Sequence, residues 1–291
     1  MNSFFIERFN SSVRRSCANA SFQGAFPAWP RIVHSPELSL SPTSQQAFKF
    51  IESCLSKCET QHTVCRLPSP QLPTRLIKVS QTCLSSVRLV ETASLPNEPY
   101  IALSYCWGKG DNVKTTIANY DDMQKAIIVA SLPQTLQDAV IITRKLGQKY
   151  IWIDALCIIQ DSPSDWEREA AMMAPVYRNA YLSIAAETAA AASEGFLARQ
   201  HLAAEHPSPF QVRWQTTEGL ESLLAARVVP DLEMHFNRDE DDLPLELRGW
   251  CLQERILSTR TLTYTAHELH WICRSSSACE CHTRDRYSNL D

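Results

Sequence analysis

The stretch YIWIDALCIIQ, residues 150–160, is nearly all apolar. A β-strand that is buried on both faces, as in a parallel sheet, has such a composition. We therefore predict a buried strand over residues 150–160, with one acid, Asp154, inside it.

Strand patterns and helix patterns alternate on both sides of this segment. Apolar strands are predicted over residues 100–107 and 181–186, and helices over residues 132–146 and 162–179. Pro133 and Gly147 stand where a helix begins and stops. This alternation predicts an α/β fold with a mostly parallel sheet flanked by helices.

The N-terminal part of the chain has a different pattern. Residues 1–40 are punctuated by Ser and Pro, and we expect an irregular tail. A helix is predicted over residues 43–65, and a β-hairpin over residues 74–79 and 87–92. Residues 41–95 therefore form an N-terminal helix and hairpin that precede the main domain.

The main domain is predicted over residues 96–285, with an insertion at residues 195–247. The insertion has few clean periods, although residues 210–214 suggest a strand. A helix around Glu254 and closing strands over residues 261–265 and 268–273 complete the domain.

Composition excludes several classes of protein. The net charge of −4 argues against nucleic-acid binding, which needs a basic patch. No run of about 18 apolar residues is present, so no membrane span is expected. The eleven cysteines follow no regular framework, which favours a reducing compartment and a cytoplasmic localisation.

One acid stands on the apolar stripe of the helix RGWCLQERILS, residues 248–258. At about 100° per residue, Glu254 lies near the middle of a stripe formed by Leu247, Trp250, Cys251, Leu257 and Ser258. A carboxylate that faces a core costs several kcal/mol unless it is paired, protonated or used. Two interpretations stay open: a buried salt bridge, with Arg144, Arg178 or Arg248 as partner, and a functional site.

Further candidate residues lie at the end of the strand over residues 100–107. In open α/β sheets, ligands bind at the carboxyl ends of the strands. Tyr105 and Trp107 could stack on a ring, and Ser104 could bind a sugar hydroxyl, or all three could simply face the core or a helix. Asp154 could position a ligand, cap a helix or pair with an arginine. Asp165 and Glu169 are expected to be exposed acids at a capped helix start.

The sequence contains little evidence for a metal site, a phosphate-binding loop or a catalytic nucleophile. Cys54, Cys58, His62 and Cys65 would extend about 16 Å along one helix, too far for one zinc ion. A pair of them would need help from elsewhere, for which the candidates are Cys273, Cys279, Cys281 and His282. This spacing leads us to predict no metal. GxxxxGK[ST], GxGxxG and GxSxG motifs are missing, so we expect no nucleotide cofactor site and no serine hydrolase.

Three blocks in order resemble the HET (heterokaryon incompatibility) domain of filamentous fungi. They are YIALSYCWG at residues 100–108, the segment from LPQTL at 132–136 through YIWIDALCIIQ to Ala180, and RGWCLQERILS at 248–258. PTRLIKV at residues 73–79 and the helix with Cys54, His62 and Cys65 also resemble what commonly precedes that domain.

This resemblance implies a role in non-self recognition and programmed cell death. The HET domain in turn resembles the TIR domain, a flavodoxin-like α/β fold. Many TIR domains cleave NAD⁺ with a glutamate in a Trp-Cys-x-x-Glu helix. The motif falls here on Trp250, Cys251 and Glu254, so the resemblance implies a catalytic Glu254 beside substrate-binding Ser104, Tyr105, Trp107, Asp154 and Trp250.

Two main functional hypotheses follow, and a zinc-dependent hydrolase is a third alternative. In the first, the chain is an NAD⁺ glycohydrolase, with NAD⁺ as substrate rather than cofactor, and Glu254 stabilises an oxocarbenium-like transition state. In the second, the chain is a non-enzymatic death-signalling module in which Glu254 is a structural ion pair. Self-association or binding of a protein partner is expected in both.

Overall fold

The computed structural model describes nine segments of the chain in two units. The described residues are 18–22, 41–66, 71–110, 112–198, 210–215, 221–228, 244–245, 249–266 and 268–280. One unit combines Met1–Glu37 with His201–Glu240, and the other combines Leu38–Gln200 with Asp241–Asp291.

The smaller unit contains a three-stranded antiparallel sheet. Its strands are β1 (Ala18–Phe22), β8 (Phe210–Gln215) and β9 (Glu221–Val228), in the order β1-β9-β8. The strand predicted over residues 210–214 is confirmed by β8. The expectation of an irregular tail is wrong for β1, because this strand is formed by pairing with β9, about two hundred residues further along the chain.

The larger unit is built on a nine-stranded sheet with the order β12-β11-β10-β7-β4-β6-β2-β3-β5. The strand bounds, in chain order, are β2 Arg75–Val79, β3 Ser86–Glu91, β4 Ile101–Ser104, β5 Ile127–Ile128, β6 Tyr150–Trp152, β7 Leu182–Ala186, β10 Arg260–Tyr264, β11 Leu269–Cys273 and β12 Ser277–Cys279.

The predicted α/β class is confirmed. Parallel pairing joins β10, β7, β4 and β6, the four central strands. The outer strands add antiparallel pairs on both sides, so the sheet as a whole is mixed rather than mostly parallel. The β2–β3 hairpin predicted from residues 74–79 and 87–92 is one of these antiparallel additions.

The apolar run at residues 150–160 is only partly a strand. β6 ends at Trp152, and a turn of helix, α4 (Asp154–Cys157), follows it. The prediction of one continuous strand was wrong because a fully buried helical turn is as apolar as a buried strand. The Asp154 side chain favours the turn, since its Oδ1 accepts a 2.7 Å hydrogen bond from the Ala155 amide.

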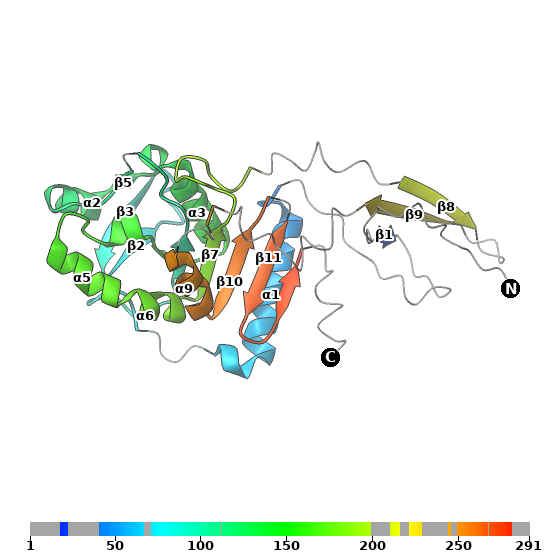
Figure 1. The fold of residues 1–291 in the computed structure, drawn as a ribbon, viewed down its shortest axis with the longest axis horizontal. Coiled ribbons are helices and arrows are strands. Elements are labelled where there is room, and N and C mark those ends of the chain that lie inside the picture. Colours follow the sequence, from blue (N-terminus) through cyan, green and yellow to red (C-terminus); the bar gives the residue numbers. More distant parts are fainter. Residues whose placement is uncertain are drawn as a thin grey trace. The chain divides into compact units, whose positions relative to one another are not determined.

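Helices cover the sheet and its ends. Their bounds are α1 Gln45–Gln61, α2 Tyr120–Lys125, α3 Gln134–Lys145, α5 Pro163–Ala171, α6 Met173–Asn179 and α9 Gly249–Leu257, with short 3₁₀ turns at Thr63–Cys65, Ile117–Asn119 and Val129–Ser131. α1 packs on β11, α3 on β2 and β6, and α6 on α9 (Figure 1). Within the described segments, no helix has the length and apolarity that a membrane crossing needs.

Two predicted helices differ from their expected extents: one ends early and the other divides in two. The helix over residues 43–65 stops at Gln61, and His62 leaves it with an extended backbone, φ −102° and ψ 96°. The helix over residues 162–179 divides into α5 and α6 at Met172. The Ser162 cap is confirmed, because its hydroxyl accepts a hydrogen bond from the Asp165 amide.

Small side chains on two central strands face α9. In the parallel register, Ala102 lies beside Ser183 and Ser104 beside Ala185. The Ser258 hydroxyl, just after α9, lies 2.7 Å from the Ser183 hydroxyl, and Ala185 clusters with Cys251 of α9. Side-chain hydrogen bonds therefore join α9 and the residue after it to β4 and β7.

Candidate functional site

The carboxyl ends of the parallel strands meet at one edge of the central sheet. β4 ends at Ser104, β6 is followed by Asp154 at the start of α4, and β7 is followed by Glu187. Ser104 and Glu187 are buried polar residues at this edge. The end of the strand predicted over residues 100–107 therefore lies at the carboxyl edge of the parallel strands.

Glu254 reaches this edge from α9. It is buried, with 6% of its surface exposed, and its Oε2 accepts a short hydrogen bond from the Ser104 hydroxyl. Its backbone carbonyl lies 2.7 Å from the Ser258 hydroxyl, which ties the last turn of α9 to β7 through Ser183. The predicted inward orientation of Glu254 and Cys251 is confirmed.

Tyr177 of α6 contacts the end of β4. Its buried hydroxyl donates a 3.0 Å hydrogen bond to the Leu103 carbonyl. Burial raises the pKa of Tyr177 well above its usual value, and the charges of Glu254 and Asp154 raise it further. Both carboxylates thus act on one phenol, which remains protonated at neutral pH.

Asp154 is held by two hydrogen bonds. Its Oδ2 accepts from the Trp107 indole at 2.8 Å, and its Oδ1 accepts from the Ala155 amide at 2.7 Å. Two of the predicted site residues are thereby brought into direct contact. Asp154 is the first residue of α4, whose N-cap is Ile153, and its carboxylate lies beside the partly buried indole of Trp107.

The loop after β4 is held by a glycine. Gly108 has φ +75°, and a Cβ atom there would lie 2.4 Å from the Ala191 Cβ. The neighbouring Trp107 carbonyl accepts a hydrogen bond from the Ala192 amide at 3.2 Å. Only glycine accommodates both the left-handed backbone and this close approach.

Two predicted substrate-binding aromatics lie in unlike surroundings. Tyr105 is 2% exposed and belongs to the main core, so its ring is covered. Trp250 is 58% exposed on the outer side of α9. The structure therefore brings together Ser104 with Glu254 and Trp107 with Asp154, and leaves these two aromatics outside that set.

The expected arginine partners of Glu254 lie elsewhere or outside the described residues. Arg144 donates to the carbonyls of Ser80 and Cys83, at 3.1 and 3.2 Å. Among the described residues neither Arg144 nor Arg178 forms an ion pair, and Arg248 lies outside them.

The acids predicted to be exposed at the start of α5 are instead buried in an ion-pair network. Arg75 lies 2.5 Å from Asp165 and 3.4 Å from Glu169, and its Nε donates to the Cys157 carbonyl at 2.7 Å. All three charged side chains are at least 94% buried. The four-residue spacing of Asp165 and Glu169 was the available signal, because it places both on one helix face.

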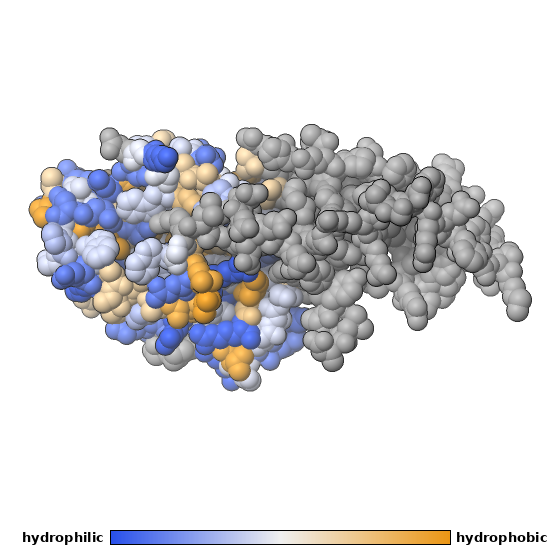
Figure 2. Space-filling model, in the orientation of Figure 1, coloured by the Kyte–Doolittle hydropathy of each residue, from blue (hydrophilic) through white to orange (hydrophobic). Residues whose placement is uncertain are grey.

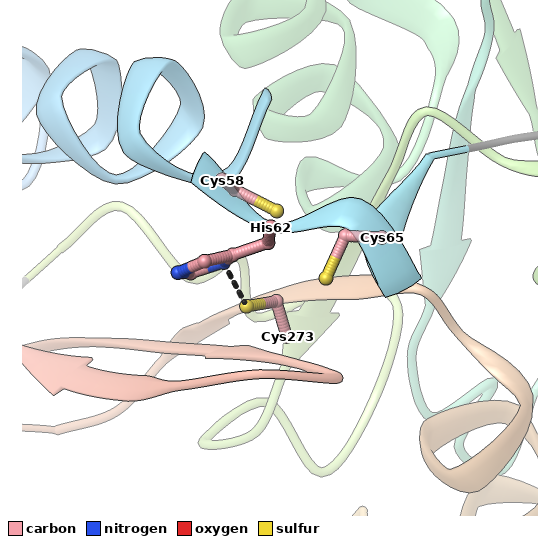
Figure 3. A group of neighbouring side chains, drawn as sticks. All are labelled: Cys58, His62, Cys65 and Cys273. Carbon is pink, nitrogen blue, oxygen red and sulfur yellow. Dashed lines mark hydrogen bonds between the residues drawn. The ribbon is translucent and has the colours of Figure 1, made fainter. Parts of the chain in front are cut away.

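Four potential metal ligands gather at the C-terminal end of α1. The ligand atoms of Cys58, His62, Cys65 and Cys273 all lie within 4.8 Å of one another (Figure 3). The argument from spacing assumed a helix through Cys65, but the helix ends at Gln61, so His62 and Cys65 turn back toward Cys58. Cys54 is not a member of this group. Cys273, which the sequence suggested as an additional ligand, is a member. Cys281 and His282 lie outside the described residues.

The fold and this edge define an α/β protein with three carboxylates, those of Asp154, Glu187 and Glu254, at the carboxyl edge of its parallel strands. Residues 100–254 match the model of the family described as Heterokaryon incompatibility protein (HET). The match covers more than half of the chain, and the chain therefore belongs to this family. No curated protein and no solved structure matches the chain.

Proposed function

We propose that this chain is a cell-death effector of heterokaryon incompatibility that hydrolyses NAD⁺ at the nicotinamide–ribose bond, with Glu254 as the catalytic carboxylate. Membership of the HET family supports the incompatibility role. The resemblance to TIR domains, with their flavodoxin-like fold and Trp-Cys-x-x-Glu helix, supports the reaction. A reducing, cytoplasmic location fits both the cysteine content and a cytosolic dinucleotide.

The hydrogen bond from Ser104 to Glu254 is the observation that carries this proposal. It joins the helix of the third sequence block to the strand end of the first, although residues 195–247 stand between β7 and α9. A carboxylate at the carboxyl edge of parallel strands lies where α/β folds bind their ligands.

The proposed reaction needs one carboxylate and one water molecule. The bond between C1′ of the ribose and the nicotinamide nitrogen breaks, and its electron pair leaves with neutral nicotinamide. Glu254 would hydrogen-bond the ribose hydroxyls and stabilise the positive charge that develops on the sugar. Water then bonds to C1′ and releases a proton, so the products are ADP-ribose, nicotinamide and H⁺.

Neighbouring residues receive supporting roles in this proposal. Ser104 would fix the rotamer of Glu254 and Tyr177 would remain a neutral neighbour. Trp107, held by Asp154, is the aromatic best suited to contact a ring, since Tyr105 is covered. Trp250 would contact substrate only from the outer side of α9.

The test compares Glu254→Gln with Glu167→Gln, a change at an exposed acid of α5. Glutamine keeps an acceptor for Ser104 but removes the charge. We expect Glu254→Gln to reduce nicotinamide release at least about 100-fold and to abolish toxicity in expressing cells, while Glu167→Gln changes neither. Purified full-length protein is assayed over a range of concentrations, and thermal melting verifies folding. Full activity of folded Glu254→Gln overturns the assignment.

A second function is favoured by the outer surface of α9. Leu252 and Ile256, one helical turn apart, are 62% and 69% exposed, and hydrophobic residues gather at the position of α9 in Figure 2. These residues suit a non-enzymatic module that associates with a second copy of the chain. In that case Leu252→Gln with Ile256→Gln abolishes self-association in sedimentation and toxicity in cells, and Glu254→Gln remains toxic.

A further inference from the structure

The group formed by Cys58, His62, Cys65 and Cys273 has the composition of a closed structural zinc site. Cys58 ends the buried face of α1, His62 and Cys65 flank the 3₁₀ turn Thr63–Cys65, and Cys273 is the last residue of β11. Three thiols and one imidazole, with no open position, are a ligand set that holds structural Zn²⁺ in proteins.

The separations of the ligand atoms fit a tetrahedron. With Zn–S bonds of about 2.3 Å and Zn–N bonds of about 2.0 Å, neighbouring ligand atoms lie roughly 3.5–3.8 Å apart. The His62 Nδ1 lies 3.3 Å from the Cys273 sulfur, and all four ligand atoms are within 4.8 Å of one another. In Figure 3 the three sulfur atoms point toward a common centre beside the imidazole ring. Contraction of the widest separation by up to about 1 Å would complete the coordination.

A buried arginine beside the group provides a second, independent argument. Arg260 is 4% exposed, and its Nε donates to the Cys58 sulfur at 3.2 Å. Its Nη2 donates to the Cys65 carbonyl at 3.0 Å, and its guanidinium lies over the Tyr181 ring at 5.4 Å. Among the described residues no carboxylate pairs with Arg260.

A buried cation needs a negative partner, because desolvating an unpaired charge costs several kcal/mol. Zn²⁺ bound by three thiolates and a neutral histidine carries a net charge of −1. Arg260 would neutralise that charge and donate to a ligand sulfur, as outer residues of zinc sites do. Three neutral thiols would leave the guanidinium without a counter-charge.

We propose that Cys58, His62, Cys65 and Cys273 bind a structural Zn²⁺ ion, with Arg260 as the outer residue that balances its charge. The ion would tie the end of α1 to the end of β11, segments more than two hundred residues apart in the chain. The site shares no residue with the Ser104–Glu254 edge, and its role is to hold α1 on the sheet.

The experiment measures the metal content of the purified full-length chain by mass spectrometry, without a metal-affinity step. We expect one zinc per chain in the wild type and in Cys54→Ser, the matched control one turn earlier on α1. Cys65→Ser and Cys273→Ser should lose the zinc. Arg260→Met should bind zinc roughly 10–100-fold more weakly in a competition with a chromophoric chelator.

A second measurement, made on the wild type, tests the proposal even if the cysteine variants do not fold. Wild-type protein stripped with a chelator is titrated with Co²⁺, which in a tetrahedral thiolate site gives intense visible bands and a thiolate-to-metal band in the near ultraviolet. Stripped protein should also melt at a lower temperature and recover with Zn²⁺. The proposal is overturned if the wild type holds no zinc and gives no such bands, if a disulfide among these cysteines is found, or if Cys273→Ser retains zinc as Cys54→Ser does.

Discussion

The hydroxyl of Ser104, at the end of β4, donates a hydrogen bond to the carboxylate of Glu254, 150 residues later in the chain. Both residues are buried, at 6% exposure each. The contact crosses the boundary between sheet and helix, so it fixes where α9 places its acid. The local sequence around either residue does not predict this contact.

Removal of this donor should destabilise the fold measurably. Ser104→Ala leaves a buried carboxylate with one hydrogen bond fewer, and we expect a loss of about 1–3 kcal/mol in the free energy of unfolding. Urea denaturation measures it, with Ser131→Ala as control, because Ser131 is exposed and its hydroxyl donates only to the Ile128 carbonyl. Ser104→Thr keeps the hydroxyl and should recover part of the loss. Equal stability of Ser104→Ala and the wild type would contradict the structural role of this bond.

The buried network around Arg75 should be more costly to break. Arg75→Met leaves the buried Asp165 and Glu169 with only Arg168, whose side chain is 54% exposed, as a cation, and we expect a loss of up to about 3–5 kcal/mol. Lys125→Met is the matched control, because the Lys125–Asp122 pair is 75% and 78% exposed and such pairs contribute about 0–1 kcal/mol. Both changes are compared by chemical denaturation at neutral pH. Similar losses in the two variants would show that burial does not strengthen the Arg75 network.

The same network predicts a dependence of stability on acid. Burial alone would raise the pKa of Asp165, but the Ile159 amide and the Arg75 guanidinium outweigh it and hold that pKa below its usual value of 3.8. A carboxyl with a lowered pKa stabilises the fold fully above its unfolded pKa, and this contribution is lost as pH falls through the folded value. Stability should therefore fall as pH decreases below about 4. In Asp165→Asn that part of the pH dependence should be missing from denaturation curves measured across the acid range.

Gly108 should not tolerate a side chain. Gly108→Ala adds a Cβ 2.4 Å from the Ala191 Cβ at φ +75°, and we expect a loss of at least about 1–3 kcal/mol. Gly249→Ala is the control, because no atom lies within 4 Å of its Cβ position and helical alanine is favoured over glycine. Thermal melting of the two variants should differ in sign relative to the wild type. A neutral Gly108→Ala would mean that the loop after β4 moves freely.

Local pattern located the β2–β3 hairpin and the strands around Leu103 and Ile184, which are short apolar runs. On α9 it placed Cys251 and Glu254 correctly, but Trp250, assigned to the same stripe, is 58% exposed. Pattern was a poor guide where one apolar run changes from strand to helix. The run at residues 150–160 contains both β6 and α4, and its composition is the same in both.

Contacts between residues far apart in the chain were the second reason why predictions from the sequence were wrong. β1 depends on β9, and the ion pairs of Asp165 and Glu169 on helix α5 depend on Arg75 of β2. The metal-ligand group shows the same effect, because the turn after Gln61 and the position of Cys273 decide it together. The spacing of residues along α1 predicts neither the turn after Gln61 nor the position of Cys273.

The sequence by itself determined the α/β class, the family blocks and the acid on the apolar stripe of α9, because periodicity and composition record what each residue must face. Only the tertiary structure decided that Glu254 meets Ser104, that Trp107 meets Asp154, and that Cys273 joins Cys58, His62 and Cys65. These contacts depend on the order of strands in the sheet. Strand order brings together residues that are 47 to 211 positions apart, and no local spacing encodes it.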